Sequence, residues 1–196
     1  MTGEMAMKTP EQKKQPAAWV SVLLIGLRLL LICAVVAGII SFVYAVTKPK
    51  AEANLKATKD AAISEIFGAS DASDGKDGFY TVRYGENLAA TGYCVESVAG
   101  GFGGDLTLMV GFDAKGKILG VSIVSHSETP GLGARVNDAN YLSQYAGKSG
   151  ALTIDKDGGT DIDAISGATI SSRAVLSAVN KATERLQTYL AGGNAQ

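Results

Sequence analysis

The sequence predicts an α+β protein, with a single N-terminal transmembrane helix followed by a mostly antiparallel α+β domain. Three observations support this class. An apolar run without any charge covers residues 29–46, segments rich in β-branched and aromatic residues recur between residues 79 and 124, and an amphipathic pattern follows residue 171. Strands that precede a packing helix, without alternating with helices, are typical of α+β domains.

The composition narrows the possible functions. The 196 residues suit one domain with a short extension, and the formal net charge is -1 with scattered basic residues. Nucleic acid is therefore not an expected partner, because phosphate-backbone binding needs concentrated positive charge. Cys33 and Cys94 form no C-x-x-C pair, so the sequence predicts neither an iron–sulfur nor a zinc site, and we assign no metal to the chain.

The apolar run is long enough to span a bilayer. Its 18 residues give about 27 Å of helix. We expect residues 1–18 to form a short N-terminus and residues 19–47 a transmembrane helix, with Arg28 extending toward the headgroups and Trp19 and Tyr44 at the interfaces. A cleavable signal peptide is an alternative, but this apolar core is longer than most signal sequences have. Lysines on both sides leave the orientation undetermined by charge.

The next segment, residues 48–78, is expected to contain a juxtamembrane helix and a loop. Leu55, Ala62, Ile63 and Ile66 mark a possible apolar face over residues 50–67. Residues 68–78 are rich in Asp, Ser and Gly, which indicates a loop.

The remaining elements belong to a domain that we expect over residues 79–191, followed by a flexible C-terminus at 192–196. Strands are predicted at 79–84, 92–98, 106–112 and 117–124, with a hairpin turn at 113–117. One or two helical turns are expected at 141–145. The last helix is predicted to begin near Ser171, because apolar residues recur there at spacings of three and four: Val175, Val179, Ala182, Leu186 and Leu190.

The segment Asp163-Ala-Ile-Ser-Gly-Ala-Thr-Ile-Ser-Ser172 carries the strongest chemical signal. Gly167 and Ala168 leave the hydroxyl of Thr169 accessible, and the start of a helix offers unpaired N–H groups that suit a phosphate. Ser171 or Ser172 is the candidate N-cap. Spacing alone also fits a plain loop with a helix cap.

A second motif is Ser125-His-Ser-Glu-Thr-Pro-Gly-Leu-Gly133. Pro130 fixes one backbone angle while Gly131 and Gly133 permit unusual ones, which predicts a rigid loop at a strand end with N–H groups available to a flat polar ligand. An ordinary tight turn is the alternative. His126, the single histidine, is expected to be structural.

Both motifs resemble the FMN-binding domain family. The match to the flavinylation signature covers Asp163, Ser166, Gly167, Ala168, Thr169 and Ser171, with Ala164 where the family often has glycine. The resemblance implies covalent FMN, joined to Thr169 through a phosphoester, and no catalytic residue in turnover. The other cofactor-binding residues that it implies are Ser166, Gly167, Ala168, Ser171, Ser172, Asp163, Glu128, Thr129, Pro130, Gly131, Leu132, Gly133 and Gly101.

The chain as a whole is similar to the G subunits of Rnf ion-translocating oxidoreductases. That likeness implies an electron-transfer component of a complex that couples ferredoxin:NAD electron transfer to Na⁺ or H⁺ translocation. The implied partners are the membrane and iron–sulfur or flavin subunits, a flavin transferase for maturation, and the lipid bilayer. It also implies a single-pass protein of the cytoplasmic (inner) membrane, with a cytoplasmic N-terminus and an extracytoplasmic domain.

Two alternatives stay open from the sequence. One is the C subunit of a sodium-pumping NADH:quinone reductase, which shares the anchor and the threonyl-FMN signature. The other is a membrane-tethered binding or assembly module without flavin.

Overall fold

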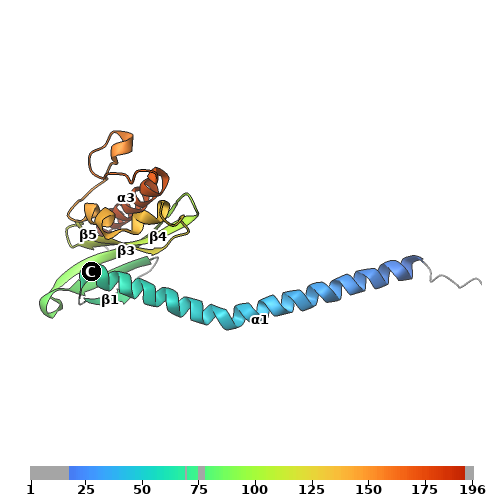
Figure 1. Cartoon of the computed structure of the whole chain (residues 1–196). Coiled ribbons are helices and arrows are strands. Elements are labelled where there is room, and N and C mark those ends of the chain that lie inside the picture. Colours follow the sequence, from blue (N-terminus) through green and yellow to red (C-terminus); the bar gives the residue numbers. More distant parts are fainter. Residues whose placement is uncertain (1–17, 69, 75–77, 193–196) are drawn as a thin grey trace, which may run out of the picture. The chain divides into compact units, whose positions relative to one another are not determined.

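The computed structural model describes residues 18–68, 70–74 and 78–192, and the chain divides into two compact units that meet between Ala53 and Asn54 (Figure 1). The predicted ends at residues 1–18 and 192–196 lie almost wholly outside the described residues.

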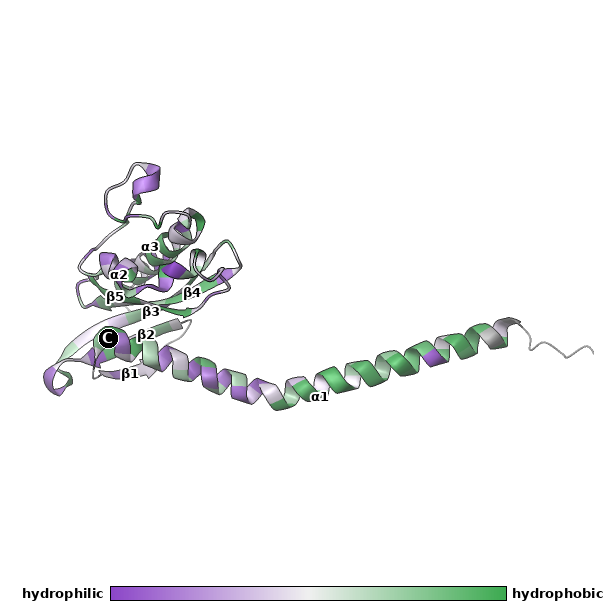
Figure 2. Ribbon diagram, in the orientation of Figure 1, coloured by the Kyte–Doolittle hydropathy of each residue, from purple (hydrophilic) through white to green (hydrophobic). Residues whose placement is uncertain are grey.

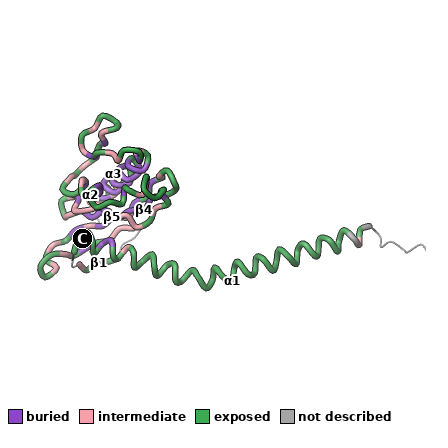
Figure 3. The backbone as a smooth tube through the Cα atoms, in the orientation of Figure 1, coloured by how far each residue is buried: buried purple, intermediate pink, exposed green. Residues whose placement is uncertain are grey.

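The first unit is the apolar part of helix α1 (Ala18–Phe67). This is the one helix among the described residues that is long and apolar enough to cross a membrane, and Figure 2 shows the change from apolar to polar residues along it. Nearly all of its side chains are exposed (Figure 3). Residues 50–67 are helical, as predicted, but they continue the same helix without a break at residue 47. Pro49 is accommodated within it, with the loss of one backbone hydrogen bond.

The second unit is built on a five-stranded antiparallel sheet in the order β1-β2-β3-β4-β5. The strands are β1 (Ser70–Asp74), β2 (Phe79–Tyr84), β3 (Ala90–Gly100), β4 (Asp105–Asp113) and β5 (Ile118–Ser125). The mostly antiparallel α+β class is thus confirmed, and so are all four predicted strands and the hairpin turn, in which Asp113 accepts hydrogen bonds from the N–H groups of Lys115 and Lys117.

Strand β1 corrects the loop predicted at 68–78. Its Asp- and Ser-rich sequence has little strand preference, but every residue of β1 is paired with β2, and Arg83 on β2 donates to Asp71 at 2.6 Å. Pairing with a neighbouring strand therefore overrides local preference at this sheet edge.

The main core lies between one face of the sheet and helix α3 (Thr169–Ala191), with α2 (Ala139–Leu142) and short 3₁₀ turns at Gly133–Asn137, Ser143–Tyr145 and Asp155–Asp157 (Figure 1). The helical turns expected at 141–145 are confirmed. Alternate residues of β4 enter this core: Leu106, Leu108, Val110 and Phe112. The segments that follow β3 and β5 lie beside the start of α3.

The opposite sheet face is covered by residues 54–67 of α1. Ala62, Ile63 and Phe67 pack there against Val82, Cys94 and Met109. Polar contacts flank this smaller cluster, since Lys59 pairs with Glu96 at 2.7 Å and Ser122 donates to Glu65 at 2.7 Å. Leu55 from the predicted apolar face stays largely exposed.

Candidate functional site

Three loops enclose a cavity of about 380 Å³ at the start of α3. One is the glycine-rich turn between β3 and β4, one follows β5, and one leads into α3. The lining residues are Phe102, Glu128, Thr129, Leu132, Gly133, Gly167, Ala168, Thr169, Ile170 and Ser171. The two motifs singled out in the sequence, which lie about 40 residues apart along the chain, therefore meet in one cavity.

Thr169 is the first residue of α3 and is half-buried in the cavity wall. Gly167 has a left-handed backbone (φ +82°) that turns the chain into the helix, and Ala168 occupies the N-cap position without any side-chain cap. The first N–H groups of a helix have no partner within it and carry its positive dipole end. The Thr169 hydroxyl thus stands at a helix start that favours an anion.

The predicted N-cap is wrong, because Ser171 and Ser172 lie inside the first turn of α3 and are both buried. Ser172 instead accepts the N–H of Ile165 at 3.1 Å, which ties the preceding loop to the helix. Ser171 lines the cavity. The helix starts two residues earlier than expected because the bare residues Gly167 and Ala168 let the chain turn without a polar cap.

Side chains from other segments hold the loop before Thr169 by hydrogen bonds. The amide of Gln144 binds Asp163 at two points, accepting its N–H at 2.8 Å and donating to its carbonyl at 3.4 Å. The carboxylate of Asp155 accepts the N–H of Ala164 at 2.9 Å, and this hydrogen bond is the main reason that the pKa of Asp155 is lowered. Tyr141 donates to the carbonyl of Ser172 at 3.3 Å. The backbone around Thr169 is accordingly held in place before any ligand arrives.

Glu128 is the charged residue of the cavity wall. It is only 6% exposed. Its Oε1 accepts the N–H of Phe102 at 2.8 Å, whereas its Oε2 is buried and has no hydrogen-bond partner within the described residues. The N–H of Glu128 donates to Nδ1 of His126 at 3.3 Å, which agrees with a structural role for that histidine.

Two glycines make room for this carboxylate. A Cβ atom added to Gly101 or to Gly133 would collide with the carboxylate oxygens of Glu128, and at Gly133 it would also crowd the hydroxyl of Ser171. Glycine at both positions therefore lets the backbone of each loop approach the Glu128 carboxylate closely, which any side chain would prevent.

The cavity mouth is apolar. Phe102, Leu132 and Ile170 are 71%, 54% and 52% exposed, although they belong to the compact second unit. Exposed apolar side chains that gather at a cavity indicate a ligand or partner surface. Phe102 and Ile170 are not among the predicted site residues, although Ile170 lies inside the segment 163–172 and Phe102 directly follows the predicted Gly101.

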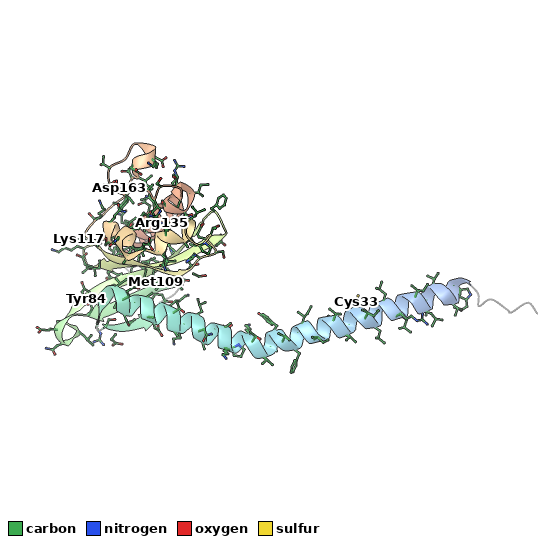
Figure 4. All side chains as sticks on the ribbon, in the orientation of Figure 1. Cys33, Tyr84, Met109, Lys117, Arg135 and Asp163 are labelled. Atoms are coloured by element: carbon green, nitrogen blue, oxygen red, sulfur yellow. The ribbon has the colours of Figure 1, made fainter. Side chains whose placement is uncertain are left out.

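The structure brings together most of the predicted cofactor-binding residues, but not all. Pro130, Gly131 and Ser166 are exposed and do not line the cavity. Gly101 is half-buried and Ser172 is buried, and neither of them lines it. Asp163 lies with Arg135 and Gln144 along a separate groove of about 540 Å³; Asp163 and Arg135 are labelled in Figure 4. Across the described ranges, no group of three His, Cys, Asp or Glu side chains is arranged to hold a metal.

Comparison with known proteins assigns this region a cofactor. Residues 101–184 match the family model described as FMN-binding domain. That range includes every residue lining the cavity. The chain therefore carries an FMN-binding domain.

Relatives align beyond this domain. The chain is 33% identical over 178 residues to the G subunit of the proton-translocating ferredoxin:NAD(+) oxidoreductase complex of Clostridium ljungdahlii, across 88% of this chain and 95% of that protein. It is 35% identical over 130 residues to the G subunit of the ion-translocating oxidoreductase complex of Stutzerimonas stutzeri, across 62% of this chain and 56% of that protein.

Among solved structures, the C subunit of the Na(+)-translocating NADH-quinone reductase from Parabacteroides distasonis matches with a TM-score of 0.48 and 25% identity, over 57% of this chain and 60% of that one.

The long apolar helix and the relatedness to subunits of ion-translocating complexes identify a membrane-anchored redox subunit. The chain belongs to the G-subunit family of ion-translocating oxidoreductase complexes.

Proposed function

We propose that the chain is the membrane-anchored electron-transfer subunit of an Rnf-type complex and carries FMN through a phosphoester to the hydroxyl of Thr169. The complex would couple ferredoxin:NAD electron transfer to Na⁺ or H⁺ movement. The names of the relatives, one a proton-translocating ferredoxin:NAD(+) oxidoreductase and the other an ion-translocating oxidoreductase, support such coupling. The observation that carries the proposal is the position of Thr169, at an uncapped helix start that opens into a cavity of the FMN-binding domain.

The residues of the cavity fit such a group. The N–H groups at the start of α3 suit a phosphate, and the apolar side chains of Phe102, Leu132 and Ile170 suit the flat ring of a flavin. FMN, when bound, supplies the capacity to accept and release single electrons. The chain's own residues would hold this group, with Thr169 and the start of α3 at its phosphate and with Phe102, Leu132 and Ile170 along its ring.

The remaining steps fall to partners. Electrons must be supplied and removed by other subunits. A threonine hydroxyl is too weak an acid to attack a phosphoanhydride without help, so a separate flavin transferase would move the FMN part of FAD to the hydroxyl, with AMP as the leaving group. We place the N-terminus in the cytoplasm and the FMN-binding domain on the other side of the membrane.

The proposal predicts one modified residue. Mass spectrometry of the peptide that contains Thr169, from the complex purified out of its native membrane, is expected to show an added mass equal to one FMN minus one water. Thr169→Ala is expected to abolish the fluorescent band in a denaturing gel while leaving the protein in the membrane fraction. Ser177→Ala is the matched control, because Ser177 is an exposed hydroxyl residue of α3 outside both the signature and the cavity wall. A fluorescent Thr169→Ala band would refute the attachment site.

A further inference from the structure

We propose that Glu128 is a flavin-positioning residue whose free carboxylate oxygen accepts a hydrogen bond from the cofactor and holds the midpoint potential low. This inference rests on the proposed occupancy of the cavity by FMN. It concerns a role that the attachment at Thr169 does not require.

The geometry singles out one oxygen. Oε1 of Glu128 is already occupied by the N–H of Phe102 at 2.8 Å, but Oε2 is buried without a partner among the described residues. Glu128 lines the same cavity as Thr169 and Ser171. A buried carboxylate oxygen without a hydrogen bond is unfavourable, and such groups in native proteins are normally satisfied.

The surroundings of the carboxylate argue against a purely structural role. The bond to Phe102 needs a single acceptor oxygen, which the uncharged amide of Gln would supply equally well. The second oxygen is therefore not needed for that bond, and no described cation forms an ion pair with the carboxylate. The chain therefore keeps a buried carboxylate whose second oxygen is left for a donor that enters the cavity.

FMN offers donors of the required kind, namely the imide N–H of its ring and the hydroxyls of its ribityl chain. Either would fill Oε2. A negative charge beside the flavin also opposes the addition of an electron, because like charges repel strongly at low effective dielectric. Removing that charge should accordingly make the flavin easier to reduce.

Binding is tested first without the covalent bond. In full-length Thr169→Ala protein, riboflavin is titrated by fluorescence quenching with and without Glu128→Gln. We expect the Glu128→Gln change to weaken binding about tenfold, as loss of a hydrogen bond to a charged group does. Two further ligands show which donor is involved, since lumiflavin lacks the ribityl hydroxyls and 3-methyllumiflavin also lacks the imide N–H. The two proteins should bind a ligand without the relevant donor with equal affinity.

The midpoint potential is the second readout. In otherwise native protein, Glu128→Gln is expected to keep the fluorescent band at full intensity and to shift the flavin potential to a more positive value in a spectroelectrochemical titration. Glu128→Asp, which keeps the charge, should remain nearer the native potential. Glu86→Gln is the matched control, because Glu86 is exposed and lies outside the cavity wall. Its potential should not move.

Unfolding separates this role from a structural one. Because Gln removes a buried charge that has no partner, flavin-free Glu128→Gln protein should be at least as stable as the flavin-free parent, even as flavin binding weakens. Equal affinity for riboflavin and an unchanged potential would overturn the inference, and so would weaker binding caused by unfolding. A native protein without covalent flavin would instead overturn the attachment at Thr169, while the riboflavin titration would still decide the role of Glu128.

Discussion

At the scale of single residues, the site depends on small side chains that let functional groups approach each other. Gly167 turns the chain with a left-handed backbone, and the N-cap Ala168 contributes no polar group of its own. A polar capping side chain at these positions would compete for the N–H groups that begin α3, and a larger side chain would crowd them. The hydroxyl of Thr169 is therefore accessible because Gly167 and Ala168 have no bulky or capping side chain.

Cys94 shows the opposite environment, since its thiol is fully buried in the smaller core. Burial raises its pKa from 9.0 to about 12. An unreactive, structural thiol is the consequence, because the thiolate is the reactive form.

This shift predicts a loss of stability in alkali. The folded pKa of Cys94 lies above the unfolded one, so its contribution is complete below pH 9 and declines as the pH rises from 9 toward 12. The free energy of unfolding should fall by at most about 1.4 kcal/mol per pH unit from this group. Denaturant unfolding of the wild type and Cys94→Ala at several pH values measures it.

Burial also raises the pKa values of Tyr141 and Tyr145, which lower the stability in alkali in the same direction. Both tyrosines are present in both proteins, so the difference between the two slopes of unfolding free energy against pH comes from Cys94. Parallel pH profiles for the two proteins would contradict the assignment. The absolute stability of Cys94→Ala is not the criterion, since the substitution also leaves a small cavity.

At the scale of elements, helix α1 serves two environments with one continuous backbone. Its first part is apolar all round, whereas residues 54–67 place Ala62, Ile63 and Phe67 against the sheet. The sequence predicted both parts but separated them at residue 47, because composition changes there while the backbone hydrogen bonding continues.

The contact between α1 and β4 predicts a sensitive glycine. A Cβ atom on Gly111 would collide with the side chains of Ile66 and Phe67. Gly111→Ala should therefore destabilise the domain by about 1–3 kcal/mol through overpacking. Urea unfolding of the detergent-solubilised protein, followed by far-UV circular dichroism, is the measurement.

Gly100→Ala provides the control for that substitution, since a Cβ atom there would meet nothing within 4 Å and the backbone needs no left-handed conformation. It should leave the unfolding midpoint almost unchanged. Equal destabilisation by both substitutions would show that close packing of α1 on β4 is not the cause.

At the scale of the whole molecule, the proposed function requires the FMN-binding domain and the short N-terminus to lie on opposite sides of the membrane. Basic residues flank the apolar segment on both sides, with Lys13, Lys14 and Arg28 before it and Lys48 and Lys50 after it. Charge asymmetry therefore does not set the orientation.

Reporter fusions test this orientation. Alkaline phosphatase, which is active only outside the cytoplasm, should be active when fused after residue 196, whereas β-galactosidase should be inactive at the same position. The reverse result would place the domain in the cytoplasm and would contradict the proposed location of the electron relay.

The sequence by itself determined the features that depend on local pattern. The apolar run, four strands and the hairpin at Asp113 follow from residue type and spacing. The assignment of the segment around Thr169 is what the family resemblance implies. Its resemblance to the FMN-binding domain family also pointed to the loop at Glu128.

Only the tertiary structure decided the features that depend on long-range contacts. Pairing with β2 makes a strand of residues 70–74, and the meeting of three loops gives Glu128 one satisfied and one free oxygen while adding Phe102 and Ile170 to the site. The physical reason is that hydrogen bonds and close approaches between distant residues exist only after the chain folds, so no local pattern contains them.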